Sequence, residues 1–484
     1  MNGITVLSNF LWRFAERVGA QGVKLLVELI LARILMPEEY GIIALVTVFI
    51  TILNVFVDSG LGNALIQKKE ADDLDFSSVF WFNVVWCLIL YGVLYFASPL
   101  IASFYRKNEL ILVLRVLGLQ VIISGVKNVY QAYVSRNMQF RKFFFSTLGG
   151  TIGAAIIGIT MAYRGYGVWA LVAQHLFNML VDTIILCFTV HWHPKRQFSF
   201  SRLKGLLNYG WKLLVSSLLD TVYNEVQALI IGKVYSSSDL AFYNRGLLFP
   251  QVIASNVNTS IDSVLLPSMS KEQDTRTRVK AMTRRAIMTS TYILAPLMIG
   301  MAFISEPMIK LLLTEKWLPC VPFLRVFCIA LLFFPIHTAN LNAIKAMGRS
   351  DLFLKLEVMK KIVGIITILV TMQISVMAMA IGVLVSSVLG QIINSWPNRK
   401  LLDYRYVDQL KDIFPNLFMA IVMGLLIYPM KYIPVPEALV IFFQLAAGMC
   451  IYLFLSKITH NETLKYLLGL VKSHMNKKQD LKAE

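Results

Sequence analysis

The stretch Ser8–Met36, SNFLWRFAERVGAQGVKLLVELILARILM, is long enough to cross a membrane as one helix, yet it carries a regular polar stripe. The stripe consists of Arg13, Arg17, Gln21, Lys24 and Glu28, spaced by three or four residues. This spacing places all five side chains on one face of a helix. Because a charge near the bilayer centre costs about 2.5–3.5 kcal/mol, the stripe predicts a polar cavity facing this helix.

Apolar segments of similar length recur along the whole chain of 484 residues, which is 57% hydrophobic. Soluble domains are only about 45–50% apolar. The sequence therefore predicts an all-α polytopic membrane protein with about 14 transmembrane helices. The predicted spans are 8–36, 41–65, 77–103, 110–134, 145–163, 167–190, 206–234, 240–268, 283–313, 319–344, 352–371, 375–395, 413–430 and 436–456.

The formal net charge of +18 comes mainly from Lys and Arg in short loops on the side of the N-terminus. The positive-inside rule then predicts that both termini are cytoplasmic, in a multi-pass protein of the bacterial cytoplasmic (inner) membrane. We expect no nucleic-acid partner, because there is no basic soluble module. We also expect the first helix to be an uncleaved insertion signal, since no cleavage-site pattern precedes it.

Cysteine and histidine give no sign of a metal or a disulfide. The five cysteines are scattered and form no metal-binding spacing. His191 and His193 lie in a basic loop without neighbouring carboxylates. We therefore predict no metal and no cofactor.

The chain contains an internal duplication. Residues 31–43 align with residues 231–243, which pairs Arg33 with Lys233 and Glu39 with Asp239. Weaker matches follow in the same order, 54–59 with 258–263 and 114–116 with 324–326. Two repeats of six helices have the same orientation and are related by an axis along the membrane normal. The predicted parts are an N-terminal lobe at 1–195, a C-terminal lobe at 196–400, two further helices at 401–456 and a basic cytoplasmic tail at 457–484.

The polar stripe is duplicated too. At an offset of 199 it falls on Lys212, Ser216, Asp220, Tyr223 and Gln227. Shorter polar stripes occur on three other predicted helices, at Asn54 and Asp58, at Asn258 and Asp262, and at Gln174, Asn178 and Asp182. The simplest arrangement is a water-filled cleft between two six-helix lobes.

Several stretches carry a family resemblance: Trp12, Glu16-Arg17, the segment 31–41, DSGLGNALIQKK at 58–69, FWFN at 80–83 and FYNRG at 242–246. Over roughly residues 5–455 the chain resembles the polysaccharide exporters of the multidrug/oligosaccharidyl-lipid/polysaccharide superfamily, in the Wzx-type branch with colanic-acid and teichuronic-acid exporters. The resemblance implies a flippase that moves an undecaprenyl-pyrophosphate-linked oligosaccharide from the cytoplasmic to the outer leaflet by alternating access. It also implies that a polysaccharide polymerase is a partner, and that the last two helices form a groove for the lipid tail.

A pyrophosphate head would be bound by Arg or Lys through charge-assisted hydrogen bonds. The first candidates are Arg13, Arg17 and Lys24, and the second are Lys127 and Lys212, which could instead extend to lipid headgroups. Ion pairs are the alternative for the first helix, among Arg13, Glu16 and Arg17 and between Lys24 and Glu28. The predicted glycan contacts are Asn54, Gln120, Asn178, Asn224, Asn258 and Asn340.

No GxxxxGK[ST] sequence is present, so we predict a secondary transporter, driven by protons, sodium or the membrane potential. The candidate coupling acids are Glu28, Asp58, Asp182, Asp220 and Glu225, each of which could instead be permanently paired in the bundle. The turns at 35–41 and 234–241 could form an external gate in which Glu38 and Glu39 meet Lys233, or be two solvated turns.

Three other functions compete with the exporter. A cation-coupled multidrug antiporter of the same superfamily would have a similar fold, but its cavity would favour acids over the three cations of the first helix. A peptidoglycan-precursor flippase would share the pyrophosphate lipid. An integral membrane glycosyltransferase needs a large aqueous catalytic surface, which the short loops do not provide. We therefore predict that the protein is not an enzyme and that its partners are the lipid-linked glycan and membrane lipids.

Overall fold

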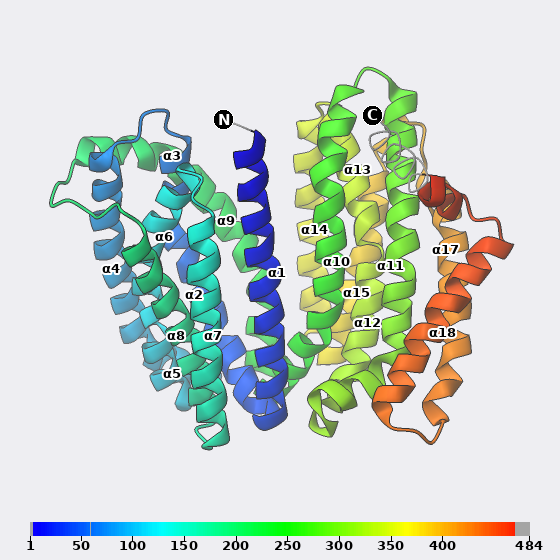
Figure 1. The fold of residues 1–484 in the computed structure, drawn as a ribbon, viewed down its shortest axis with the longest axis horizontal. Coiled ribbons are helices and arrows are strands. Elements are labelled where there is room, and N and C mark those ends of the chain that lie inside the picture. Colours follow the sequence, from blue (N-terminus) through cyan, green and yellow to red (C-terminus); the bar gives the residue numbers. More distant parts are fainter. Residues whose placement is uncertain (1–2, 59, 470–484) are drawn as a thin grey trace. The chain divides into compact units, whose positions relative to one another are not determined.

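The computed structural model describes the backbone of residues 3–58 and 60–469, and the side chains of 19–58, 60–208 and 210–469. Throughout these ranges the regular structure is helical, which confirms the predicted fold class. The chain divides into two compact units, Met1–Ala241 and Phe242–Glu484 (Figure 1). The helices that begin in the first unit are α1 (Gly3–Ile34), α2 (Pro37–Asp58), α3 (Leu61–Gln67), α4 (Asp73–Tyr105), α5 (Glu109–Leu117), α6 (Leu119–Arg136), α7 (Arg141–Tyr163), α8 (Val168–Thr189), α9 (Phe200–Val234) and α10 (Ser237–Lys271).

The second unit contains most of α10 and a long central helix, α11. Its remaining elements are α11 (Arg276–Leu313), η1 (Glu315–Cys320), α12 (Val321–Leu332), α13 (Phe334–Ala346), α14 (Ser350–Thr371), α15 (Val376–Ser395), α16 (Asn398–Leu401), α17 (Tyr406–Ile427), η2 (Tyr428–Tyr432) and α18 (Glu437–Ile458). The helices α17 and α18, which the duplication leaves over, pack against α11. Hydrogen bonds fix them there: Asn416 donates to the Met288 carbonyl at 3.1 Å, and the Tyr452 hydroxyl to the Tyr292 carbonyl at 3.0 Å.

Ten segments of the described chain are long and apolar enough to cross a membrane, so the protein is a multi-pass membrane protein. Four further helices, α1, α9, α10 and α14, have 22 to 35 residues but are more polar. These four correspond to predicted spans, and they include both helices with the long polar stripes. The total of fourteen stays a prediction.

The duplication is visible in equivalent hydrogen bonds of the two repeats. The Asn128 amide donates to Asp58 at 2.5 Å in the first, and the Asn342 amide to Asp262 at 2.8 Å in the second. Arg115 and Arg325 likewise each donate to a serine hydroxyl at 3.0 Å, Ser98 and Ser305.

The start of the second helix in each repeat is stabilised in the same way. Glu39 accepts a hydrogen bond from the main-chain N–H of Met36 at 2.7 Å, and Asp239 accepts one from that of Ser236 at 3.1 Å. An acid at a helix N-terminus satisfies an otherwise unpaired N–H group and complements the helix dipole. The pairing of Glu39 with Asp239 in the sequence therefore has a physical cause.

Small residues set the closest helix packing in the first unit. Along α7, Gly150 faces Asp182 of α8, Gly153 faces Phe177 and Gly158 faces Gln174. In each case a Cβ atom would come within 2.8–3.0 Å of α8. Glycine at these steps lets two membrane helices approach closely, which favours dispersion contacts between them.

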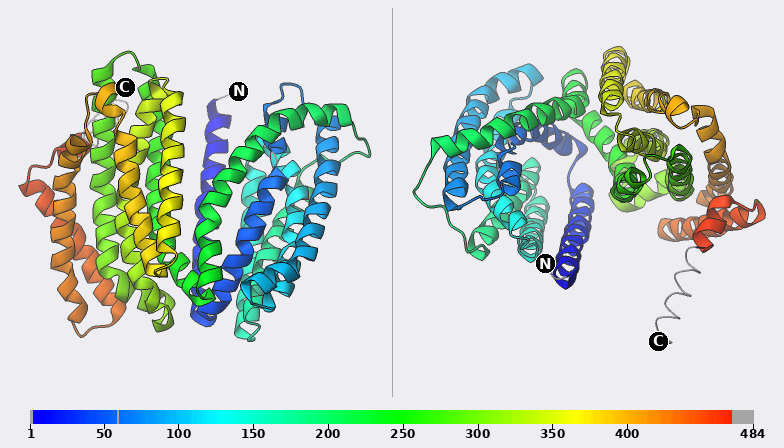
Figure 2. Two further views of the ribbon diagram at one scale, coloured as in Figure 1. Left: turned by 180° about the vertical axis from the view of Figure 1, so that it is seen from behind. Right: turned by 90° about the horizontal axis from the view of Figure 1, so that it is seen from above.

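The long helix α9 packs on α2, α3 and α4, and so its contacts place it in the first unit. Figure 2 shows it, in green, running along that unit. The sequence duplication instead assigns α9 to the second repeat, and the predicted lobe boundary lay at 195/196. The contacts divide the chain at Ala241/Phe242, after α9 rather than before it.

Candidate functional site

A polar cavity of about 440 Å³ lies within the first unit, where α2 ends and α3 begins. Helices α6 and α9 complete its wall. Its lining residues are Val55, Asp58, Gly60, Gly62, Asn63, Ile66, Asn128, Gln131, Ala132, Ser135, Leu213, Leu214, Ser217 and Thr221. One carboxylate, three amides and three hydroxyl groups therefore face the space, and no Lys or Arg is among the described residues that line it.

Two glycines shape the edge of this cavity. Gly60, which directly precedes α3, has φ +69°, a left-handed conformation that glycine adopts without strain. A Cβ atom there would lie 2.7 Å from the main chain of Gly210, so the two glycines allow α9 to approach. At Gly62 a Cβ atom would lie 2.8 Å from the amide oxygen of Asn128. Glycine at 60 and 62 thus permits the close packing of α9 and α6 on this turn.

Asp58 is the acid of the cavity. Its carboxylate is exposed there and accepts a hydrogen bond from Asn128 at 2.5 Å, which leaves acceptor capacity facing the cavity. One turn earlier, the Asn54 amide oxygen is buried and has no hydrogen-bond partner among the described residues. Two residues that the sequence placed on one cavity-facing stripe thus bring polar groups to the same region. Their roles in coupling or glycan contact stay predictions.

The candidate cations of the first helix are placed only in part. The side chains of Arg13 and Arg17 lie outside the described residues. Lys24 lies 3.9 Å from Glu28, with 65% of the lysine side chain exposed. Lys24 and Glu28 therefore form the mutual pair that was the alternative to substrate binding, but the Lys24 ammonium group remains accessible.

Lys127 and Asp182, which the sequence analysis gave different roles, form one ion pair. Their charged atoms are 2.6 Å apart between α6 and α8, and the side chains are only 15% and 6% exposed. The second carboxylate oxygen of Asp182 is buried without a hydrogen-bond partner among the described residues. The Lys127 ammonium is thus engaged by a buried acid in this structure rather than presented to a cavity.

The predicted stripe of α9 lies beside the cavity rather than along its wall. Lys212, Asp220 and Asn224 are exposed, and Glu225 is half-buried. The cavity is lined instead by the adjacent face, which carries Ser217 and Thr221. The predicted stripe does not include these two hydroxyl groups, although their spacing of four residues places them on one face of the helix.

The other amides predicted as glycan contacts differ in how deeply they are buried. Gln120 and Asn178 are half-buried, and Asn258 accepts a hydrogen bond from the Thr338 hydroxyl at 2.5 Å. Asn340 is fully buried, with its side chain bonded to Gln409 at 2.8 Å and to Asn398 at 2.7 Å. In this structure the Asn340 amide therefore joins α13 to α16 and α17 and is closed to a glycan.

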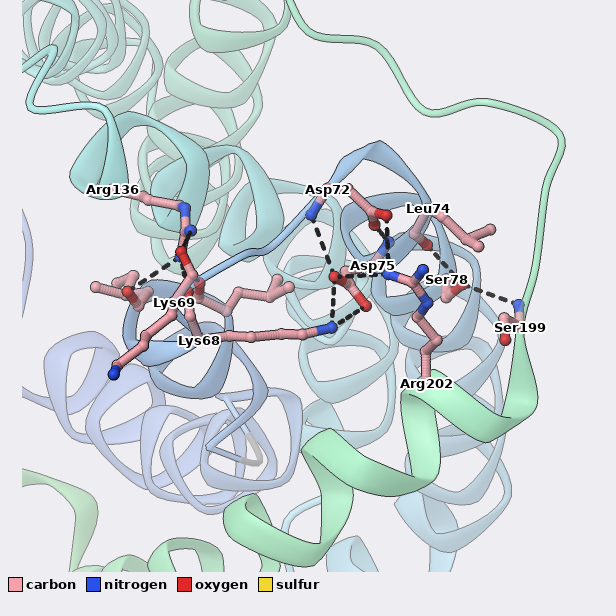
Figure 3. Close-up of polar contacts among 11 residues, drawn as sticks. Lys68, Lys69, Asp72, Leu74, Asp75, Ser78, Arg136, Ser199 and Arg202 are labelled. Atoms are coloured by element: carbon pink, nitrogen blue, oxygen red, sulfur yellow. Dashed lines mark hydrogen bonds and ion pairs between the residues drawn. The ribbon is translucent and has the colours of Figure 1, made fainter.

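A charged cluster that the sequence analysis missed joins α3, α4 and α9 (Figure 3). Lys68 contacts both oxygens of the fully buried Asp75, at 2.6 and 2.7 Å, and Arg202 lies 2.8 Å from Asp72. The main-chain N–H of Asp75 and the Arg202 guanidinium hold the pKa of Asp72 below its usual value. Arg136 donates to the carbonyls that end α3, at Leu65, Lys68 and Lys69. The cluster fixes the first turn of α9 to the turn between α3 and α4.

The turns proposed as an external gate do touch, but through other partners. Lys107 pairs with Glu38 at 3.7 Å and donates to the Ser237 hydroxyl at 2.6 Å, while Lys233 donates to the Phe104 carbonyl. Of the two alternatives, the meeting of Glu38 and Glu39 with Lys233 is therefore not the arrangement seen in this structure. A Cβ atom at Gly41 would overlap Ser237, so the two turns are in direct contact.

Comparison with known proteins places this geometry in a family. Residues 30–322 match the family model described as "Polysaccharide biosynthesis protein". The chain is 27% identical to the succinoglycan biosynthesis transport protein ExoT of Rhizobium meliloti (strain 1021), over 68% of this chain and 67% of that protein. It is 23% identical to the teichuronic acid biosynthesis protein TuaB of Bacillus subtilis (strain 168), over 86% and 87%. It is 24% identical to the lipopolysaccharide biosynthesis protein WzxC of Escherichia coli (strain K12), over 80% and 79%.

Solved structures show the same fold. The lipid II flippase MurJ, in an inward closed conformation, aligns with a TM-score of 0.72 at 15% identity, over 96% of this chain and all of that one. An inward-facing multidrug resistance MATE family transporter of the MOP superfamily aligns with a TM-score of 0.61 at 16% identity, over 79% of this chain and 94% of that one. The family match covers more than half of the chain, and the chain therefore belongs to the polysaccharide biosynthesis protein family.

Proposed function

We propose that this protein is a flippase that carries a polyprenyl-pyrophosphate-linked oligosaccharide from the cytoplasmic to the outer leaflet for the synthesis of a cell-surface polysaccharide. Family membership supports this, as do relatives named for succinoglycan transport and for teichuronic acid and lipopolysaccharide biosynthesis. The fold shared with MurJ and a MATE transporter is compatible with alternating access.

The observation that carries the proposal is the cavity at the α2–α3 turn, which is lined by amides, hydroxyl groups and one carboxylate. Sugar hydroxyls both donate and accept hydrogen bonds, and Asn128, Gln131 and Ser217 can do the same. The Asp58 carboxylate adds a strong acceptor. The volume of the cavity, about 440 Å³, is within the usual range of ligand pockets, about 300–1,000 Å³.

The anionic head would need cations outside this cavity. Lys24 and Lys212 have exposed side chains in the described part of the chain, and Arg13 and Arg17 share the stripe of Lys24. We assign the pyrophosphate to these basic residues, through charge-assisted hydrogen bonds. The glycan then lies against the amide and hydroxyl groups of the cavity.

Transport would be driven without ATP. Moving one charge through the membrane potential is worth about 2.3 kcal/mol per 100 mV, so a dianion leaving a negative interior gains roughly twice that. Coupling to protons or sodium would add to this gain. We place the protein in the bacterial cytoplasmic membrane with both termini cytoplasmic, where it hands the glycan to a polymerase and performs no bond chemistry itself.

The test is flipping of a fluorescent polyprenyl-pyrophosphate oligosaccharide in proteoliposomes, measured as loss of access to a membrane-impermeant quencher. We expect Asn128→Leu and Gln131→Leu to slow flipping at least tenfold, because each removes a hydrogen-bonding amide from the cavity wall. Asn137→Leu, at the exposed end of the same helix, is the matched control and should keep the native rate. Native protein that moves cationic drugs but not this lipid would contradict the proposal.

A further inference from the structure

An apolar groove of about 800 Å³ lies within the second unit, between α10 and α11, which are both green in Figure 1. Val257 and Val264 of α10 and Ile293 of α11 are among the apolar side chains of its walls, and Tyr466 and Leu467, which follow α18, complete it. We call this surface the α10–α11 groove. It is formed by other helices than α17 and α18, to which the family resemblance assigns the lipid tail.

The serine hydroxyls that line the groove are already hydrogen-bonded. Ser260, Ser268 and Ser290 each donate to the main-chain carbonyl four residues earlier in the same helix, at 2.5–2.8 Å. Their protons are therefore not available to a ligand. Because the rest of the lining is mainly apolar, the groove suits a hydrocarbon chain rather than a sugar.

Thr289 of α11 differs from these serines. Its hydroxyl oxygen is buried and has no hydrogen-bond partner among the described residues, although the side chain lines the groove. A buried polar group without a partner costs stability, and a polar group of a ligand would remove this cost. Arg285, which also lines the groove, lies one turn earlier, about 6 Å along the helix axis and on the same face.

Arg285 presents a positive charge at this end of the groove. The residue is exposed, and its guanidinium carbon lies 3.9 Å from the centre of the Tyr466 ring. Within the described chain Arg285 forms no ion pair. Glu462 acts on it electrostatically, but both carboxylate oxygens of Glu462 accept hydrogen bonds from Arg284, at 3.1 Å. Arg285 can therefore donate charge-assisted hydrogen bonds to an anion.

The chain around this end of the groove is strongly basic. Residues 271–285, which include the end of α10 and the start of α11, contain six Lys or Arg residues and two acids. Lys271, the last residue of α10, is exposed and has no ion-pair partner in the described part of the chain. Basic residues at the end of a membrane helix attract anionic lipids. The charge of this end therefore favours a lipid whose head carries a net negative charge.

The length of the groove matches a lipid of one leaflet. The rise along α11 from Arg285 to Ile293 is about 12 Å, and the hydrocarbon of one leaflet is about 15 Å deep. In a glycerophospholipid the ester carbonyls lie between the phosphate and the chains. The groups of α11 follow the same order, since the cation of Arg285 is followed by the Thr289 hydroxyl and then by apolar side chains. A polyprenyl phosphate has no ester carbonyl to offer to Thr289.

We propose that the α10–α11 groove binds one anionic glycerophospholipid, such as phosphatidylglycerol. Its phosphate lies at Arg285, an ester carbonyl accepts a hydrogen bond from Thr289, and one acyl chain follows the apolar wall to Ile293. This lipid is a resident ligand, distinct from the transported glycan lipid. In the proposed orientation, with the C-terminus in the cytoplasm, it belongs to the cytoplasmic leaflet. Because Tyr466 and Leu467 complete the groove, the bound lipid ties the segment after α18 to α10 and α11.

The experiment measures lipid binding to the purified full-length protein in detergent by native mass spectrometry. The probes are dioleoyl phosphatidylglycerol and dioleoyl phosphatidylcholine, which differ in net charge. We expect the native protein to bind phosphatidylglycerol about tenfold more tightly, and Arg285→Gln to reduce this preference about fivefold. Arg399→Gln, an exposed arginine of α16 outside the groove, is the matched control and should keep the native preference.

Two further variants test the groove independently of its charge, also if Arg285→Gln does not fold. Thr289→Val removes the hydroxyl group, so it should abolish the advantage of ester-linked over ether-linked phosphatidylglycerol, which we expect to be about two- to tenfold in the native protein. Ile293→Trp, at a side chain that is 43% exposed, fills the apolar end of the groove and should weaken the binding of both lipids about threefold or more.

Three results would overturn the inference. They are a native protein that binds both headgroups equally, an unchanged preference in Arg285→Gln, and unchanged binding in both Thr289→Val and Ile293→Trp. Displacement of phosphatidylglycerol by an equal concentration of polyprenyl phosphate would overturn it as well, because the groove would then hold the tail of the substrate. All these measurements concern binding alone, so the flippase proposal stands or falls by its own transport assay.

Discussion

Replacing Lys127 by Met distinguishes a structural lysine from a phosphate-binding one. The substitution leaves the carboxylate of Asp182, 6% exposed, without the ammonium that lies 2.6 Å away. Removing one partner of a buried ion pair typically costs about 3–5 kcal/mol, because the other charge remains buried and unpaired. Polar contacts between membrane helices are often weaker, near 0.6 kcal/mol on average. Since the second oxygen of Asp182 also lacks a partner in the described part of the chain, we expect a loss of about 3 kcal/mol.

The assay is reversible unfolding in detergent, followed by tryptophan fluorescence, for Lys127→Met, Asp182→Leu and the double variant. Replacing both members of a buried pair by apolar residues is often nearly neutral, so the double variant should recover to within about 1 kcal/mol of native. Lys69→Met, an exposed lysine, is the control and should change stability by less than about 0.5 kcal/mol. A Lys127→Met protein that is as stable as native but cannot flip the lipid would refute the structural role and restore Lys127 as a phosphate ligand.

Three more predictions follow from the same structure. Gly60→Ala should destabilise the protein by about 1–3 kcal/mol, because its φ is +69° and a Cβ would meet α9; Gly165→Ala, at φ +78° in open space, should cost less in the same unfolding assay. Asp75→Asn should free the first turn of α9 and speed amide hydrogen exchange there, whereas native exchange would contradict the role of the cluster. Hydrogen bonds from Arg284 lower the pKa of Glu462 from its ordinary value of 4.5. The ionised carboxylate therefore stabilises the fold above pH 4.5, and this stabilisation is lost as the pH falls through the lowered pKa. The stability of Glu462→Gln should therefore fall less steeply in acid than that of the native protein.

The sequence was most informative where a local rule acts. Runs of about 20 apolar residues have only helical solutions in a membrane, so the fold class followed directly. Glu39 and Asp239 marked equivalent helix starts because capping depends on the adjacent turn alone. Asp58 of the predicted stripe lines a cavity within the first unit, since helical periodicity fixes the face of each residue, while its predicted role in coupling stays a prediction.

The same local rules did not predict which faces of two helices pack against each other. Lys127 and Asp182 looked like separate sites because nothing in the sequence shows that α6 and α8 face each other there. Asn340 resembled a cavity amide, yet its partners Asn398 and Gln409 are some 60 to 70 residues away. Ser217 and Thr221 were missed because the cavity meets α9 on the face next to the predicted stripe.

The amino-acid sequence alone therefore determined a duplicated, multi-pass helical protein and the polar face of each helix, because hydrophobic length and helical periodicity are local properties. Tertiary packing decided which polar groups are paired, which are sealed inside the bundle and which line the cavity. The physical reason is that a charge in a low-dielectric interior is stabilised only by a partner within a few ångströms. The identity of that partner depends on how neighbouring helices are rotated and spaced.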